Sequence, residues 1–404
     1  MDENYTKSAS NLGRSENFIL IIKNIFMERE SNFDNSEILP KYAVEGREIP
    51  EWIVSEAFLI NEALDKKVVT KEEAEKGLEG DREILDMMRK MVDVRYFVEY
   101  PVENVEPEKR GEKILELFKQ KVNVGGKEKE LADFLAEHRQ GVSLAMSTLD
   151  DETAKAVRHL NKKGVPVVGW VVVDDIEGYW TNPANVSETA QKTEAIRQWA
   201  KENDLQLTAL GFDLEKPLPY IKALSRGNII ETVKQIRSYR AKVRERSKEG
   251  DPEKQFYDLL LGLKEEGVET EIYAEPKGTK WLLGGMDVRC ADRFVEMVYT
   301  STLPGVIRKG GANSMRSRGA IPALGIVSGK ETETPGRDLL GKLPRHLTQE
   351  ELENDIGRVL DRELNLGNRE FSLRNLYLYA LNDARVALMM EQAMEKSFSS
   401  RLEK

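Results

Sequence analysis

The chain has 404 residues, 40% of them hydrophobic, so it can bury a core larger than that of one average domain. A formal net charge of −10 argues against nucleic acid or an anionic membrane as the main partner. The single cysteine, Cys290, excludes an internal disulfide and a cysteine-rich metal site, and it fits a reducing, cytoplasmic environment. The early apolar run from Phe18 to Phe26 is broken by Lys23 and is too short to span a membrane.

Residues 1–90 differ in character from the rest of the chain. They are polar and rich in helix-forming residues, and Pro40 and Pro50 interrupt them. We expect a helical N-terminal extension that packs on the remaining domain or on a second subunit, which would give a route to a homo-oligomer. Residues 1–15 are equally consistent with a solvated leader. The predicted domains are therefore 1–90 and 91–404.

Short apolar strands alternate with helical segments from residue 92 onward. Strands are predicted at 92–100, 142–147, 165–174, 205–215, 269–276, 294–300, 320–327 and 373–381. Helices are predicted at 107–121, 151–163, 184–202, between 216 and 266, at 348–364 and at 384–398. This alternation favours an α/β fold, a (β/α)8 TIM barrel, over a doubly wound sheet. No G-x-G-x-x-G follows the first strand and the chain has no P-loop, so a nucleotide-binding sheet lacks its usual support.

The end of the fourth predicted strand is the most informative place in the chain. Asp213 and Glu215 stand there, and because strand side chains alternate between faces, they should point the same way. Active sites of such barrels form at the carboxyl ends of the strands, and two acids there are costly to desolvate. They therefore indicate chemistry or cation binding. The other strand ends carry Glu99, Tyr100, Ser147, Thr148, Asp174, Asp175, Glu275, Lys277, Tyr299, Ser301, Ser328, Asn382 and Asp383.

The loop after the third predicted strand combines aromatic and amide side chains. It contains Tyr179, Trp180, Asn182 and Asn185, and it starts at Asp174. Aromatic faces stack on sugar rings, and amides exchange hydrogen bonds with ring hydroxyls. We expect Tyr179, Trp180, Asn182, Asp174 and Asp383 to contact the substrate. The alternative is a hydrophobic plug, with Asn185 capping the next helix.

Two short motifs carry a resemblance to a known family. Phe212-Asp213-Leu214-Glu215 resembles the end of the strand-four acid motif of chitinase-type glycoside hydrolases, and Met297-Val298-Tyr299 resembles their strand-six Met-x-Tyr. The resemblance implies Glu215 as the general acid, Asp213 as its supporting acid and Tyr299 as a hydrogen-bond donor to the reacting sugar.

The chain also departs from that family's pattern. The two earlier acids of the strand-four motif would fall at Thr208 and Gly211, and the usual strand-six Asp at Thr300. The strand-eight Trp would fall near Tyr379. The runs 164–182 and 211–215 are similar as well to a set of poorly characterised barrel proteins.

Three functional hypotheses follow. The leading one is a glycosidase-like hydrolase acting on a small-molecule or saccharide substrate without a cofactor, with Glu275 as the second carboxylate beside Glu215 and Asp213. The second is a Mg²⁺- or Mn²⁺-dependent lyase, isomerase or phosphodiesterase that binds its metal through Glu99, Asp213, Glu215 and Glu275. The third is a non-catalytic barrel that serves as a scaffold or ligand-binding protein.

Two basic segments bear on charged partners. The stretch 222–248 contains Arg237, Arg240, Arg244 and Arg246, and its interspersed acids indicate a solvated helix face rather than a nucleic-acid surface. The loop 305–318 is consistent with binding of an anionic group and equally with an ordinary surface loop.

Overall fold

The computed structural model describes residues 43–44, 47–48, 92–99, 106–215, 217, 229–274, 286–298, 321–325, 347–365 and 375–402. The chain divides into two compact units, one of Met1–Val92, Glu363–Phe371 and Met394–Lys404, the other of Asp93–Arg362 and Ser372–Ala393. Within the predicted N-terminal extension, the described residues form the antiparallel strands β1 (Ala43–Val44) and β2 (Arg47–Glu48). The helices predicted there lie outside the described residues.

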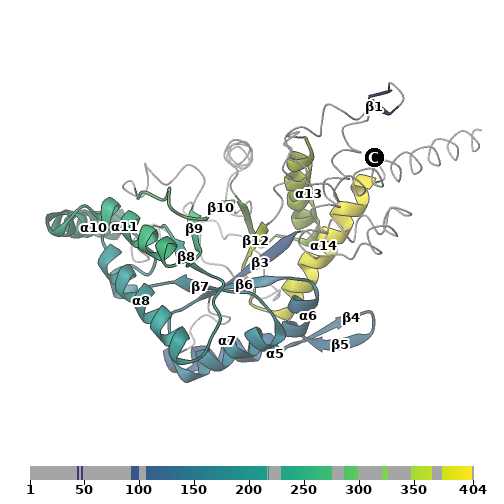
Figure 1. Ribbon diagram of the computed structural model, residues 1–404, viewed down its shortest axis with the longest axis horizontal. Coiled ribbons are helices and arrows are strands. Elements are labelled where there is room, and N and C mark those ends of the chain that lie inside the picture. The colour runs from purple at the N-terminus through teal and green to yellow at the C-terminus, as the bar shows by residue number, and fades with distance from the viewer. Residues whose placement is uncertain are drawn as a thin grey trace, which may run out of the picture. The chain divides into compact units, whose positions relative to one another are not determined.

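The second unit contains a closed barrel of eight parallel strands, which confirms the predicted (β/α)8 fold (Figure 1). The strands are β3 (Asp93–Val98), β6 (Gly141–Ala145), β7 (Val167–Val171), β8 (Ala209–Asp213), β9 (Thr270–Ala274), β10 (Arg293–Val298), β11 (Ile321–Gly325) and β12 (Asn375–Tyr379). Each falls within or overlaps one predicted strand. The barrel closes where β12 pairs with β3, with Tyr377 opposite Arg95 and Tyr379 opposite Phe97.

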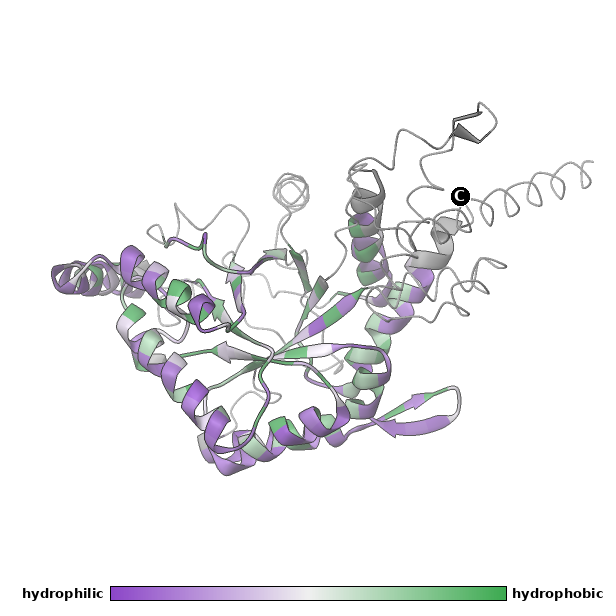
Figure 2. Ribbon diagram, in the orientation of Figure 1, coloured by the Kyte–Doolittle hydropathy of each residue, from purple (hydrophilic) through white to green (hydrophobic). Residues whose placement is uncertain are grey.

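Helices follow six of these strands in the described part of the chain. They are α5 (Pro107–Lys119), α7 (Asp151–Lys163), α8 (Val186–Glu202), α10 (Ile229–Glu249) with α11 (Pro252–Glu265), α13 (Gln349–Asn365) and α14 (Ala384–Leu402). Figure 1 shows α5, α7, α8 and α11 outside the strands, and Figure 2 shows hydrophilic residues on their outer faces. None of the described helices is long and apolar enough to cross a membrane.

Two features differ from the sequence expectations. A hairpin of β4 (Lys121–Val124) and β5 (Lys127–Glu130), followed by α6 (Leu131–Glu137), lies between α5 and β6. The single helical stretch expected before residue 266 is two helices, because Asp251 caps a new helix and Pro252 occupies its first position.

The inside of the barrel is aromatic. Phe97, Trp170, Tyr273 and Tyr377 belong to one buried cluster, in which the Phe97 ring meets the Tyr273 ring edge-on at 4.8 Å between centroids. The intervening residues face outward and pack on the helices, as Phe212 does on Phe256 of α11 at 5.6 Å. Inward-facing residues on each strand therefore alternate with helix-facing ones, and this alternation fixes which strand-end residues look into the mouth.

Candidate active site at the carboxyl ends of the barrel strands

Asp213 is the last residue of β8, and its side chain belongs to the inner face of the barrel. The inner face is identified by Gly211, where a Cβ would lie 2.3 Å from the Tyr273 hydroxyl. Asp213 follows two residues later on the same face and is 3% exposed. The backbone continues in register beyond the strand, because the Leu214 N–H donates to the Tyr273 carbonyl at 2.8 Å. Glu215 comes next and is partly exposed.

The loop 174–185 follows β7, pairs with the residue after β8, and is held in shape by its own asparagine side chains. Thr181 pairs with Leu214, and the Asn185 Oδ1 accepts from the Asn182 N–H at 2.8 Å. The Asn185 Nδ2 donates to the carbonyls of Glu177 and Trp180 at 3.0 and 2.9 Å. The expectation that Asn185 caps α8 is therefore corrected. It occupies the N-cap position, but its side chain turns back and bonds the loop backbone.

The side chain of Asn182 also forms hydrogen bonds within this loop. Its Nδ2 donates to the Trp180 carbonyl at 2.8 Å, its Oδ1 accepts from the Ala184 N–H at 3.0 Å, and the residue is fully buried. Both polar ends of the amide therefore have protein partners. The structure places Asn182 in the scaffold that holds the aromatic residues, and its contact with a substrate stays a prediction.

Tyr179 and Trp180 differ in how far they are buried. Tyr179 is 2% exposed within the interior cluster, so it lies in the core and does not form an open wall of the mouth. Its φ of 67° is in the left-handed region, which costs a residue with a side chain about 1–2 kcal/mol. Trp180 packs against the same cluster but is partly exposed, and its indole N–H makes no hydrogen bond to any described residue.

Glu99 and Tyr379 meet at the mouth where the barrel closes, at the carboxyl ends of the paired strands β3 and β12. Glu99 directly follows β3, and Tyr379 ends β12. The Tyr379 hydroxyl donates a hydrogen bond to the Glu99 Oε2. The sequence placed Glu99 among the candidate metal ligands and indicated no partner for it, because the two residues are 280 positions apart.

Lys192 on α8 lies beside the ends of β6 and β7, although no pattern in the sequence pointed to it. Its Nζ donates to the Ser147 carbonyl at 3.2 Å. Burial lowers the pKa of Lys192, and the negative charge of Asp174 opposes that shift. A lysine within an amphipathic helix ordinarily indicates a solvated position. The position of Lys192 beside the strand ends is therefore visible only in the structure.

The remaining predicted site residues divide into two groups. Asp383 directly precedes α14, and its Oδ1 accepts from the Arg385 N–H at 2.9 Å and from the Arg385 Nε–H at 3.0 Å. Glu275 and Tyr299 lie outside the described residues. Among the residues that the structure describes, no three acidic, histidine or cysteine side chains are grouped so that they could hold a metal ion.

A buried polar network lies beneath the aromatic cluster, and its centre is Glu271 of β9. This carboxylate accepts from the Nη1 atoms of Arg95 at 2.6 Å and Arg293 at 2.9 Å. It also accepts from the hydroxyls of Tyr273 at 3.0 Å and Tyr377 at 2.5 Å. Burial, followed by the charge of Glu271, raises the pKa of both tyrosines well above 10. Both hydroxyls therefore stay protonated and able to donate.

Solved structures similar to this chain include a chitinase. That chitinase, from Chromobacterium violaceum, is 12% identical, covers 78% of this chain and 99% of its own, and has a TM-score of 0.38. The spore cortex-lytic enzyme SleL from Bacillus megaterium is 12% identical, with 75% and 74% covered and a TM-score of 0.36. A D-tagatose 3-epimerase-like protein is 11% identical, with 77% and 98% covered and a TM-score of 0.40. Searches among family models and among curated protein sequences found no match.

Proposed function

We propose that the protein is a glycosidase-like hydrolase that acts on a sugar or glycoconjugate at the carboxyl ends of the barrel strands. The observation that carries the proposal is the position of Asp213, a 3% exposed carboxylate on the inner face at the end of β8. Burying a charge is costly, and the end of a barrel strand is where such a cost usually serves chemistry. Glu215, two residues later and partly exposed, is accessible to a substrate.

Glycoside hydrolysis requires one carboxylic acid to protonate the leaving oxygen and a second carboxylate to act as nucleophile or base. In this proposal Glu215 is the acid, and Asp213 holds it in position and adjusts its acidity. Glu275 is the proposed second carboxylate, because it directly follows β9, the strand that pairs with β8. Glu99 supplies another carboxylate at the mouth, oriented by the Tyr379 hydroxyl.

The loop 174–185 gives the proposal its substrate class. Trp180 is partly exposed, and aromatic faces of this kind stack on sugar rings. The side-chain amides of Asn182 and Asn185 hydrogen-bond the loop backbone and so restrict its motion. A fixed aromatic platform loses little conformational entropy when a ligand binds.

The test is hydrolysis of 4-nitrophenyl glycosides and chitin oligosaccharides by the full-length chain and by Glu215→Gln. Glutamine keeps the shape but has no transferable proton, so kcat should fall by at least about 100-fold while the thermal midpoint stays unchanged. The matched control is Glu265→Gln on the outer helix α11, which should turn over like the unmodified chain. A chain that hydrolyses none of these substrates, or a Glu215→Gln variant with full turnover, would overturn the proposal.

A further inference from the structure

The basic residues of α10 fall into two classes. Three of them have carboxylate partners, namely Lys234 with Glu231, Lys242 with Glu177, and Arg246 with Glu188 and Glu249. The other four, Arg237, Lys248, Arg240 and Arg244, are exposed and make no ion pair within the part of the chain that the structure describes. Two of these four share a pocket, namely Arg240 and Arg244. They are four residues apart, so they lie on one face of the helix, where like charges repel by about 0.2–0.5 kcal/mol.

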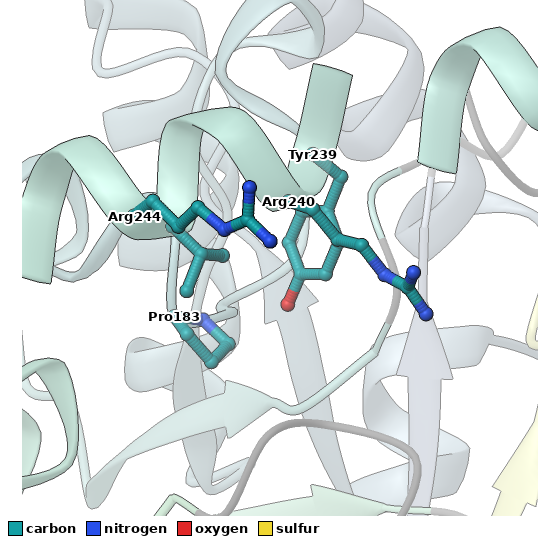
Figure 3. A pocket seen from close by; sticks show the side chains of 5 residues that line it. Pro183, Tyr239, Arg240 and Arg244 are labelled. Atoms are coloured by element: carbon teal, nitrogen blue, oxygen red, sulfur yellow. The ribbon is translucent and has the colours of Figure 1, made fainter. Parts of the chain in front are cut away.

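These two arginines line a pocket of about 310 Å³ together with Tyr239, Val243 and Pro183 (Figure 3). Figure 3 shows the Arg244 guanidinium reaching toward the Tyr239 ring, with Arg240 on the other side of that ring. Pro183 belongs to the loop 174–185, three residues after Trp180. The pocket is therefore built on the loop that also carries the aromatic platform of the mouth.

The donors in this pocket suit an anionic group. Guanidinium groups bind carboxylates and phosphates through paired, charge-assisted hydrogen bonds. Burial raises the pKa of Tyr239 to about 12, so its hydroxyl stays protonated and can donate as well. Pro183 and Val243 add apolar surface, which fits the face of a sugar ring.

We propose that the pocket of Arg240 and Arg244 binds the carboxylate or phosphate group of an acidic saccharide whose other sugars extend along the loop 174–185 toward the mouth. This inference rests on the proposed glycosidase function and makes its substrate anionic. An isolated acidic group is favoured over a long polyanion, because a protein with a net charge of −10 repels a nucleic acid along most of its surface.

The experiment measures equilibrium binding of three probes to the full chain by calorimetry. N-acetylglucosamine 6-phosphate carries a phosphate, a hyaluronan hexasaccharide carries carboxylates, and chitohexaose is the neutral match. Replacing both arginines, Arg240→Ala with Arg244→Ala, should raise the Kd of an acidic probe about tenfold and leave that of chitohexaose unchanged. The acidic probe that responds identifies phosphate or carboxylate as the bound group. Both arginines are exposed, so the variant should melt like the unmodified chain.

The matched control is Lys248→Ala, which removes an exposed positive charge from the same helix outside the pocket. It should change each Kd by less than about twofold. The inference is overturned if the double variant binds both acidic probes normally, or if Lys248→Ala weakens them equally, which would indicate a diffuse field. Tighter binding of a single-stranded oligonucleotide than of either acidic probe would also overturn it.

Measurements of binding and of turnover distinguish this inference from the proposed glycosidase function on which it rests. If arginine-dependent binding is found and neither the hexasaccharides nor the 4-nitrophenyl glycosides are hydrolysed, the pocket stands and the glycosidase proposal fails. If hydrolysis depends on Glu215 while neither Kd nor KM responds to the loss of the two arginines, the glycosidase proposal stands and the pocket inference fails.

Discussion

Gly211 of β8 leaves free the space that the Tyr273 hydroxyl of β9 occupies, since a Cβ at residue 211 would lie 2.3 Å from that oxygen. The hydroxyl uses this space to reach Glu271 Oε2 at 3.0 Å and Ser143 Oγ at 2.7 Å. Residue 211 is also where the chitinase-type motif has an earlier acid. With Tyr273 in this position, residue 211 has no room for an acidic side chain.

Replacing Gly211 with alanine should destabilise the barrel. The added methyl would overlap the Tyr273 ring, and overpacking of this kind costs about 1–3 kcal/mol. Urea denaturation of the full chain measures the effect. The control is Gly262→Ala in α11, where a Cβ meets nothing within 4 Å and the better helix former should add about 0.5–1 kcal/mol. Equal unfolding free energies for Gly211→Ala and the unmodified chain would contradict the packing described for Tyr273.

Glu271→Gln should be more damaging, because it leaves Arg95 with a buried and uncompensated charge. Breaking a buried pair from one side costs about 3–5 kcal/mol. Glu269→Gln is the matched control directly before the same strand, since the Glu269 side chain is 53% exposed and its carboxylate pairs with the Arg293 Nη2 at 2.9 Å. Glu269→Gln should lower the free energy of unfolding by less than about 1 kcal/mol. If the two variants unfold at the same urea concentration, the network contributes no more than a surface pair.

The fold could be predicted wherever the local sequence contains both ends of an element. The helix 151–163 has its predicted limits because Asp150 accepts from the Thr153 N–H at 2.7 Å and Gly164, with φ of 78°, ends it in the left-handed region. The eight strands were recognisable for a related reason, since buried parallel strands are short apolar runs between polar loops. The hairpin at 121–130 was missed because its charged residues, Lys-Glu-Lys-Glu, hide the alternation of a strand.

The candidate site could be predicted only in part. Strand periodicity predicted that Asp213 and Glu215 point the same way at the end of their strand, and the structure shows Asp213 buried on the inner face. The Glu271 network could not be found in this way, because Arg95 and Glu271 are 176 positions apart and meet only when the barrel closes. A glutamate within a short strand otherwise indicates a solvated position.

The raised pKa values of Tyr273 and Tyr377 predict a loss of stability in alkali. Each folded pKa lies above the unfolded value of 10, so the contribution is complete below pH 10 and is lost as the pH rises through the folded value. The free energy of unfolding should fall by about 1.4 kcal/mol per pH unit for each tyrosine above pH ~10. Tyr377→Phe should reduce that slope, as urea titrations between about pH 9 and 11 would show. An unchanged slope would mean that Tyr377 ionises equally in both states.

Trp180→Ala should weaken binding of a saccharide by about 1–3 kcal/mol, because a stacked aromatic on a loop contributes mainly to the complex. Calorimetry with the hexasaccharides measures the change. Tyr179→Ala gives the contrast, since that residue is buried and its removal should cost about 3–5 kcal/mol of stability. A large fall in melting temperature with unchanged binding would mark Trp180 as part of the core.

Asp213→Asn distinguishes the three functional hypotheses, because each predicts a change in a different property: turnover, metal affinity or stability. In the glycosidase proposal turnover falls, folding persists, and treatment with a chelator has no effect on the unmodified chain. In the metal-dependent alternative, with Glu99, Asp213, Glu215 and Glu275 as ligands, chelation abolishes activity, the variant first loses Mg²⁺ or Mn²⁺ affinity, and added metal partly restores it.

The scaffold alternative predicts no catalytic loss and a gain of stability from the same change. Asp213 and Glu215 are two residues apart at the end of one strand, so removing either charge relieves repulsion between them. If the two acids have no function, nothing is lost when the repulsion is removed. Asp213→Asn should then raise the free energy of unfolding by about 0.5–2 kcal/mol. The three hypotheses are tested on one preparation of the variant. Urea denaturation measures stability, magnesium and manganese titrations measure metal affinity, and hydrolysis assays measure turnover. Stability gained with hydrolysis intact would remove Asp213 from the active site.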